Sequence, residues 1–394
     1  MAVDLIDPSA QFCTYIGYSL DYLWKKISRA TDSLPSLQNR QLALHLLSFG
    51  LKRPELWPVV RTTLLELAPK MEQAGHRSDW MPLLTTGIAQ GRQQNDPEAV
   101  AELTMQLARL HQLQSNYNAA REYFKQSLDG FQTLQERRSQ AKVMGRLAYL
   151  ACLQQQYADG TQLGQQALEM LATNDPERAG IYGALGAIAR HRHEWQKCID
   201  YHHRALTLWQ QVGDQRMMAW TWRDLGVPYC MMERTAEAIA CYERALEIFQ
   251  IIHDPIHQAS TAMNLGNVYL TNNEPAKALP LYASSKIIFE ELRDGLRLGK
   301  LYTNQGIALR MLGRWSCVID ALTQSITLMR QINDWYHLAN AQEELGIVYQ
   351  RQGNKAKAMK IFSDALATAT RIEDDAGRQA LASSILDNLC EAKK

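Results

Sequence analysis

The residues of this 394-residue sequence best suited to chemistry are a group of histidines with one cysteine. The group consists of His191, His193, Cys198, His202 and His203. Imidazole nitrogens and a thiolate are preferred ligands of Zn²⁺, and two short helices could bring some of these side chains together. The group is therefore a candidate metal site.

The other chemical motifs are incomplete. His193 and Glu194 begin a string like the zinc-protease motif HExxH, but Lys197 stands where the second histidine is required. Ser139 and Lys142 form an isolated SxxK without its companion motifs. The sequence contains no GxxxxGK[ST], no GxSxG and no glycine-rich dinucleotide loop. We therefore expect no catalytic residues, no cofactor and no enzymatic activity.

Composition indicates a helical, cytoplasmic protein. Glycine and proline are sparse, which favours helix over strand, and a net charge of +1 gives no support for a nucleic-acid or membrane partner. The seven cysteines are scattered without a CxxC pair, which is typical of reduced intracellular thiols. A secretory signal is not recognisable at the start, and no stretch approaches the roughly 18 apolar residues of a membrane span.

The elements that must position any functional side chain follow from a repeat of 40 residues. Glycines recur at this interval, namely Gly186, Gly226, Gly266, Gly306 and Gly346. Nineteen residues after each glycine comes a small residue: Ala205, Ala245, Ser285, Ser325 or Ala365. An aspartate recurs with the same spacing, at Asp214, Asp254, Asp294, Asp334 and Asp374. A period of this length indicates stacked supersecondary units.

Each unit is predicted to be two amphipathic helices joined by a short turn. The glycine and the later small residue permit close helix packing, and the aspartate caps the next helix at its N-terminus. In this register His202 occupies the position that Tyr242, Tyr282 and Phe362 hold in other units, and Cys198 takes a small-residue position. The register therefore favours a packing role for the histidine–cysteine group, so we expect no metal.

The repeat predicts the division of the chain. Weaker matches upstream place Ala108 and Ala148 where the glycine would stand, which gives seven repeats over residues 101–372. Residues 373–394 are predicted to form a C-terminal capping helix. Residues 1–100 are predicted to hold helices at about 9–31, 37–51, 55–74 and 79–93. These helices form either an N-terminal capping region or two degenerate repeats, and their repeat-like lengths favour the second alternative.

The units resemble tetratricopeptide repeats. One unit matches almost all of that family's pattern through Trp222, Leu225, Gly226, Tyr229, Ala238, Tyr242 and Ala245. The period of 40 residues rather than about 34 resembles the subclass of kinesin light chains, Leu-Gly-Asn-repeat adaptors and bacterial signalling arrays. The resemblance implies an all-α fold, a right-handed superhelical α-solenoid of antiparallel helix pairs.

The resemblance also implies a concave groove lined by the first helix of each unit. Carried onto this sequence, the groove positions are Lys142, Arg146, Arg190, Trp220, Arg223, Met263, Asn264, Asn267, Lys300, Asn304, Arg310, Asn340, Glu343 and Arg351. In related peptide-binding arrays, asparagines at the positions of Asn264 and Asn304 clasp the backbone of an extended ligand. Basic residues outnumber acidic ones in this set, so an acidic or C-terminal peptide is the expected ligand.

Two functions follow from this resemblance. The first is a scaffold or adaptor that holds a protein or peptide partner in the groove. The alternative is a regulatory sensor subunit that controls a separate effector, an ATPase or a caspase-like peptidase, in bacterial signalling or defence. A nucleic-acid-binding solenoid is disfavoured, because the first helices lack a repeated aromatic–basic pattern.

Overall fold

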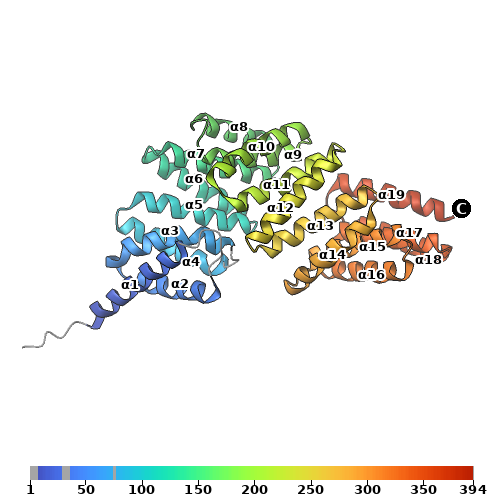
Figure 1. Cartoon of the computed structure of the whole chain (residues 1–394), viewed down its shortest axis with the longest axis horizontal. Coiled ribbons are helices and arrows are strands. Elements are labelled where there is room, and N and C mark those ends of the chain that lie inside the picture. Colours follow the sequence, from blue (N-terminus) through green and yellow to red (C-terminus); the bar gives the residue numbers. More distant parts are fainter. Residues whose placement is uncertain (1–7, 29–35, 74–76, 394) are drawn as a thin grey trace, which may run out of the picture. The chain divides into compact units, whose positions relative to one another are not determined.

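The computed structural model describes residues 8–28, 36–73 and 77–393, and all regular structure in these residues is helical (Figure 1). The N-terminal elements are α1 (Pro8–Ser28), α2 (Leu37–Gly50), a 3₁₀ turn (Pro54–Leu56), α3 (Trp57–Gln73) and α4 (Arg77–Gln93). They are followed by α5 (Pro97–Leu113), α6 (Tyr117–Thr133), α7 (Arg137–Leu153), α8 (Tyr157–Glu169), α9 (Glu177–His191), α10 (Trp195–Val212), α11 (Gln215–Met231) and α12 (Thr235–Ile251). The last helices are α13 (Pro255–Thr271), α14 (Pro275–Glu291), α15 (Gly295–Met311), α16 (Trp315–Gln331), α17 (Trp335–Arg351), α18 (Lys355–Ala369) and α19 (Asp375–Lys393).

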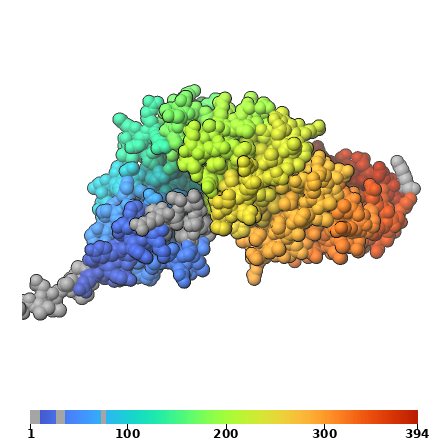
Figure 2. Space-filling model, in the orientation of Figure 1, coloured from blue at the N-terminus to red at the C-terminus, as the bar shows by residue number. Residues whose placement is uncertain are grey.

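The helices pack as consecutive pairs within two compact units, residues 1–221 and 222–394. In the first unit α5 packs on α6 and α9 on α10, and in the second unit α13 packs on α14 and α15 on α16. In the first unit α6 also contacts α7, the first helix of the next pair, and in the second unit α14 contacts α15 and α16 contacts α17. Side chains close the gaps that the ribbons leave between neighbouring helices (Figure 2). The predicted α-solenoid of antiparallel helix pairs is confirmed.

The recurring glycines permit close contact within each pair. A Cβ atom on Gly226 would lie 2.3 Å from the ring of Tyr242, and one on Gly266 would lie 2.5 Å from the ring of Tyr282. Both rings belong to the second helix of the same pair and are buried. Glycine is therefore needed at these positions, because the aromatic ring fills the space that any side chain on the first helix would require.

The small residues on the second helices permit close packing, and two of them also form hydrogen bonds. Where the residue is serine, its hydroxyl donates to a backbone carbonyl of the first helix: Ser285 Oγ to Ala259 O at 2.9 Å and Ser325 Oγ to Gly299 O at 2.8 Å. Sequence analysis predicted the close packing but not these hydrogen bonds. A buried hydroxyl requires such a partner, and helix carbonyls have a second lone pair to offer.

The recurring aspartates cap the helices that follow them. Each side chain accepts a hydrogen bond from the backbone N–H three residues later, as for Asp214, Asp254, Asp294, Asp334 and Asp374. These bonds satisfy N–H groups that have no partner inside a helix. The predicted caps are thus confirmed.

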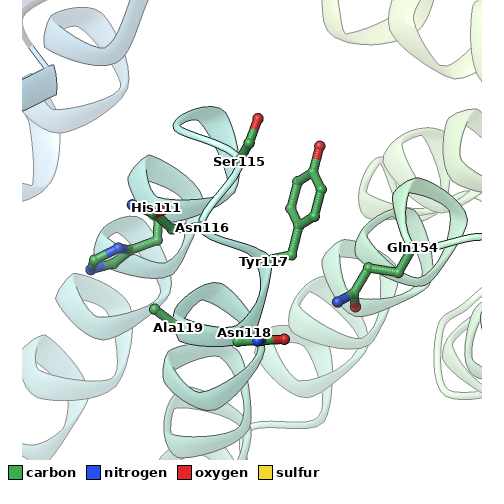
Figure 3. A pocket seen from close by; sticks show the side chains of 7 residues that line it. All are labelled: His111, Ser115, Asn116, Tyr117, Asn118, Ala119 and Gln154. Carbon is green, nitrogen blue, oxygen red and sulfur yellow. The ribbon is translucent and has the colours of Figure 1, made fainter. Parts of the chain in front are cut away.

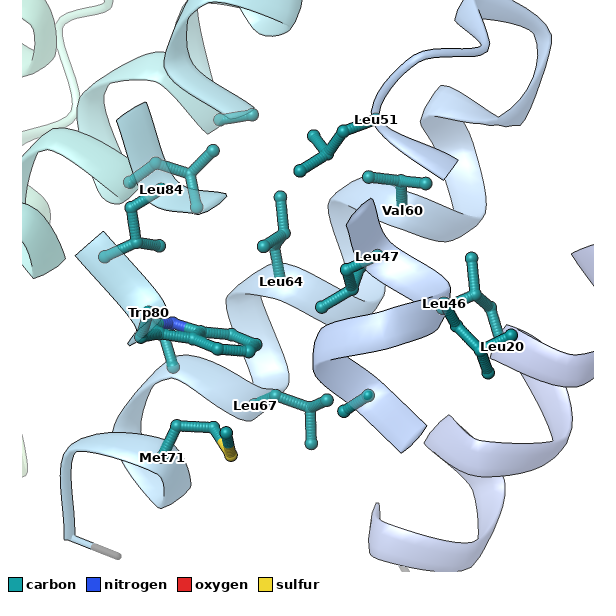
Figure 4. Close-up of a cluster of buried hydrophobic side chains, with 14 of the residues drawn as sticks. Leu20, Leu46, Leu47, Leu51, Val60, Leu64, Leu67, Met71, Trp80 and Leu84 are labelled. Carbon is teal, nitrogen blue, oxygen red and sulfur yellow. The ribbon is translucent and has the colours of Figure 1, made fainter. Parts of the chain in front are cut away.

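The N-terminal helices lie close to the predicted bounds, and a 3₁₀ turn precedes α3 where the third predicted helix was expected to begin. Residues 29–31 of the first predicted helix and residue 74 of the third lie outside the described residues. Leu20, Leu64 and Trp80 are fully buried in one core (Figure 4), which continues into α5 through Leu103 and Leu107. The N-terminal helices therefore share a core with the first predicted repeat. Among the described residues, no helix has the length and apolar character required to cross a membrane.

Candidate functional site

Two members of the histidine–cysteine group are buried in the core, whereas His191, His193 and His203 are exposed. Cys198 is fully buried, and His202 lies buried beneath Gly186, where an added Cβ would be 2.7 Å from its Nε2 atom. His191 stacks on Tyr157 with 5.8 Å between ring centres. The described residues contain no group of three histidine, cysteine or acidic side chains placed to hold a metal ion.

A pocket of about 490 Å³ lies at the turn between α5 and α6 (Figure 3). It is lined by His111, Ser115, Asn116, Tyr117, Asn118, Ala119 and Gln154. The His111 ring stacks on Tyr123 with 5.2 Å between centres, and burial lowers the pKa of His111, which favours the neutral imidazole. This pocket contains none of the predicted groove residues.

The predicted residues of the first unit lie on α7, α9 and α11, and all are partly buried. Lys142 on α7 pairs with Glu102 on α5, with 3.2 Å between Nζ and Oε1. Arg109 on α5 pairs with Glu72 on α3 at 2.8 Å. The Arg109 cation, followed by burial, lowers the pKa of Arg146 to about 10. Basic and acidic side chains therefore lie next to each other on the first helices of this unit. Arg146 lies near the cation of Arg109.

The remaining predicted residues, apart from Arg223 on α11, lie on α13, α15 and α17, the first helices of three successive pairs. These helices contact one another, α15 lying between α13 and α17. Most of the predicted side chains here are partly buried, as expected for a helix face that is neither core nor outer surface; these are Met263, Asn264, Asn267, Lys300, Asn304, Arg310 and Asn340. Arg351 is exposed at the end of α17.

A hydrogen-bond network joins α13 to α15. Asn304 Nδ2 donates to Asn267 Oδ1 at 2.7 Å, and the Tyr282 hydroxyl on α14 donates to the same oxygen at 2.8 Å. The structure thus brings two predicted residues together with a third that sequence analysis assigned to the core. The sequence did contain a signal for this contact: a tyrosine, whose hydroxyl needs a hydrogen-bond partner, stands at a buried aromatic position.

Ion pairs neutralise several of the predicted cations. Arg310 on α15 pairs with Glu344 on α17, with 3.2 Å between Nε and Oε2. Burial raises the pKa of Glu344, and the Arg310 cation opposes that rise. Arg223 pairs with Asp224 at 2.9 Å. The basic character expected from the sequence is therefore reduced, because the acidic partners were not in the predicted set.

Glu343 has a different environment from the other predicted residues. Its side chain is buried and accepts hydrogen bonds from Ser384 and from Asn388, the latter at 2.8 Å. Both donors lie on α19, so Glu343 fastens the C-terminal helix to α17. Glu343 is therefore not part of the accessible surface of α17.

Comparison with known families gives three matching segments. A family model described as tetratricopeptide repeat matches residues 177–251, and a second model of the same description matches residues 100–134 and 338–375. No curated protein sequence is significantly similar to the chain.

Several solved structures have a similar fold. A signal transduction ATPase with numerous domains from Pyrococcus horikoshii, which has a tetratricopeptide repeat sensor, superposes with a TM-score of 0.66 and 12% identity over 91% of this chain. The match spans 56% of that ATPase chain, little more than half its length. A Rap protein complexed with competence and sporulation factor gives a TM-score of 0.55 and 14% identity over 96% of this chain and 99% of that chain. Aspartyl phosphate phosphatase F from Bacillus subtilis gives 0.55 and 12% over 94% and 96%. At these identities the similarity describes the fold.

Proposed function

This chain is a tetratricopeptide-repeat protein, and we propose that it is a scaffold or adaptor that binds an extended peptide segment of a protein partner. The binding surface in this proposal is the face formed by α13, α15 and α17, which we call the amide face. It consists of Met263, Asn264, Asn267, Lys300, Asn304 and Asn340. The proposal depends above all on the hydrogen bond between Asn304 and Asn267, because it holds two side-chain amides together on adjoining helices.

Asparagine amides suit a peptide backbone because each one both donates and accepts hydrogen bonds. An extended peptide presents the same two groups at every residue, and its own sequence need not carry charge. Met263 adds a flexible apolar contact that adapts to different side chains. The amide face therefore supports binding of backbone with limited dependence on sequence.

The finer expectation of an acidic or C-terminal ligand has weaker support. Arg310 and Arg223 already have acidic partners, and a ligand carboxylate would have to compete with them. Lys300 has no ion pair within 4 Å in the described part of the chain, although its charge helps to lower the pKa of Asp334. It is the cation that the amide face offers to such a ligand. We propose backbone recognition as the main contribution to affinity, with Lys300 as a secondary contact.

The alternative function, a regulatory sensor subunit, would use the same face. The Pyrococcus horikoshii protein is described as having a repeat sensor, and the Rap protein was solved with a bound factor. In that alternative, binding of the peptide segment is the signal, and this chain responds to it by controlling a separate effector protein.

The experiment is selection from a library of random linear peptides displayed on phage, followed by affinity measurements on the purified protein. Asn264→Ala and Asn304→Ala should each weaken the selected peptides by about 1 kcal/mol, the usual contribution of a neutral hydrogen bond. The control is Arg244→Ala on α12, an exposed side chain outside the amide face. Peptides that bind both asparagine variants as tightly as the unaltered protein would refute the proposed surface.

A further inference from the structure

We infer that Tyr282, a buried residue of α14, orients Asn267 and Asn304 so that the two amides together recognise one neutral segment of peptide backbone. This inference rests on the proposed function and deepens it. It adds a positioning residue outside the amide face, and it specifies the chemistry of the ligand at one point.

The hydrogen bonds fix which groups remain for a ligand. An amide oxygen has two lone pairs, and those of Asn267 Oδ1 are taken by the Tyr282 hydroxyl at 2.8 Å and by Asn304 Nδ2 at 2.7 Å. Asn267 therefore presents its Nδ2 donors, and Asn304 presents its Oδ1 acceptor. A donor and an acceptor consequently lie side by side on α13 and α15.

This arrangement matches peptide backbone and disfavours an anion. A backbone carbonyl can accept from Asn267 Nδ2 while a neighbouring backbone N–H donates to Asn304 Oδ1. A carboxylate could accept from Asn267, but its negative charge would face the lone pairs of the Asn304 oxygen. The pair therefore selects a neutral peptide segment over an acidic side chain at this point.

Tyr282 is held rigidly enough to impose this orientation. Its side chain is fully buried, and its ring lies against Gly266, where an added Cβ would be 2.5 Å away. Burial also raises the pKa of the Tyr282 hydroxyl, so the group keeps its proton and remains a donor at neutral pH. A fixed donor on one lone pair prevents Asn267 from exchanging its oxygen and nitrogen positions.

Neighbouring repeats lack this device. Phe362 occupies the equivalent position beneath Gly346 and has no hydroxyl. Tyr242 occupies it beneath Gly226, but Val227 stands at the position of Asn267 and has no side-chain oxygen to accept its hydroxyl. The hydrogen bond from Tyr282 therefore joins α14 to α13, and Asn304 on α15 completes the site.

The test compares Tyr282→Phe with the matched control Tyr242→Phe in the full-length protein. The probes are phage-selected peptides whose binding requires Asn264 and Asn304, measured by fluorescence anisotropy. Tyr282→Phe should weaken binding about tenfold, corresponding to 1.4 kcal/mol, while Tyr242→Phe leaves the affinity unchanged. Melting temperatures of both variants should stay close to that of the unaltered protein, because a phenylalanine, Phe362, already packs at the equivalent position of α18.

A second measurement separates orientation from a general structural effect. The selected peptide is synthesised with one backbone nitrogen methylated at a time, which removes one N–H donor. One methylation should cost about fivefold in the unaltered protein, as Asn304→Ala does, and nothing further in Asn304→Ala, since both changes remove the same hydrogen bond.

The outcomes distinguish the inference from the proposed function. Equal affinities of Tyr282→Phe and Tyr242→Phe would overturn the inference alone. The inference alone would also be overturned if, for every methylated nitrogen of the peptide, the loss of affinity from methylation added fully to the loss from Asn304→Ala. Failure to select any peptide that depends on Asn264 and Asn304 would overturn the proposed function and the inference together.

Discussion

Replacing Gly226 with alanine should destabilise the second unit, although alanine is the better helix former. An added Cβ would lie 2.3, 2.5 and 2.6 Å from three ring atoms of Tyr242, well inside the ~3.5 Å contact distance of carbon atoms. Tyr242 is 3% exposed, so its ring cannot swing into solvent. The helix α11, the ring or both must therefore shift by about 1 Å.

The magnitude follows from two opposing effects. Overpacking a tight core typically costs about 1–3 kcal/mol, and alanine gains about 0.8–1.0 kcal/mol over glycine within a helix. Because three contacts are violated at once, we place the overpacking cost near the upper end of its range. Gly226→Ala should then lower the free energy of unfolding by about 1–2 kcal/mol.

The matched control is Gly183→Ala on α9, where an added Cβ would meet no atom within 4 Å. This variant should raise the free energy of unfolding by up to about 1 kcal/mol, through helix propensity alone. The assay is urea unfolding followed by circular dichroism, with hydrogen exchange to locate the change in α11 and α12. If Gly226→Ala proves as stable as Gly183→Ala, the steric account of the recurring glycine is wrong.

Three further predictions concern single residues. Asp254→Ala should cost about 1 kcal/mol through loss of the cap on α13, seen as faster hydrogen exchange in its first turn, whereas unchanged exchange would exclude a capping role. Asn388→Ala should cost about 1.5–3 kcal/mol, since it removes a donor from the buried Glu343 carboxylate, and exchange should rise throughout α19 but not α18. Burial raises the pKa of Glu344, so its contribution favours folding below the unfolded pKa and is lost as pH rises through the folded value. The stability of the unaltered protein relative to Glu344→Gln should therefore fall as pH rises from about 4 towards neutral, and a flat difference would contradict the burial of this carboxyl.

Local patterns in the sequence were sufficient to predict the helices and their pairing. The interval between Gly226 and Gly266 sets the length of a repeat, and Asp254 marks the start of α13 through a hydrogen bond that spans only three residues. Interactions of this kind depend on neighbours along the chain, which the sequence displays directly. The position of His202 in the core followed from the same register.

The surface was predictable only in part. The register placed Asn267 and Asn304 on first helices, but their hydrogen bond depends on how α13 crosses α15. Sequence analysis also counted Arg310 as an available cation, although Glu344 lies beside it on the next helix. Sequence spacing alone cannot supply these distances between helices.

The all-helical repeat fold could be predicted from local sequence patterns, because glycine spacing and helix caps act over one or two helical turns and within one helix pair. Tertiary structure alone decided which side chains remain available for a partner. It directed Glu343 beneath α19, paired Arg310 with Glu344 and aligned Asn267 with Tyr282. The physical reason is that these contacts join different helices, where a shift of about 1 Å in packing makes or breaks a hydrogen bond.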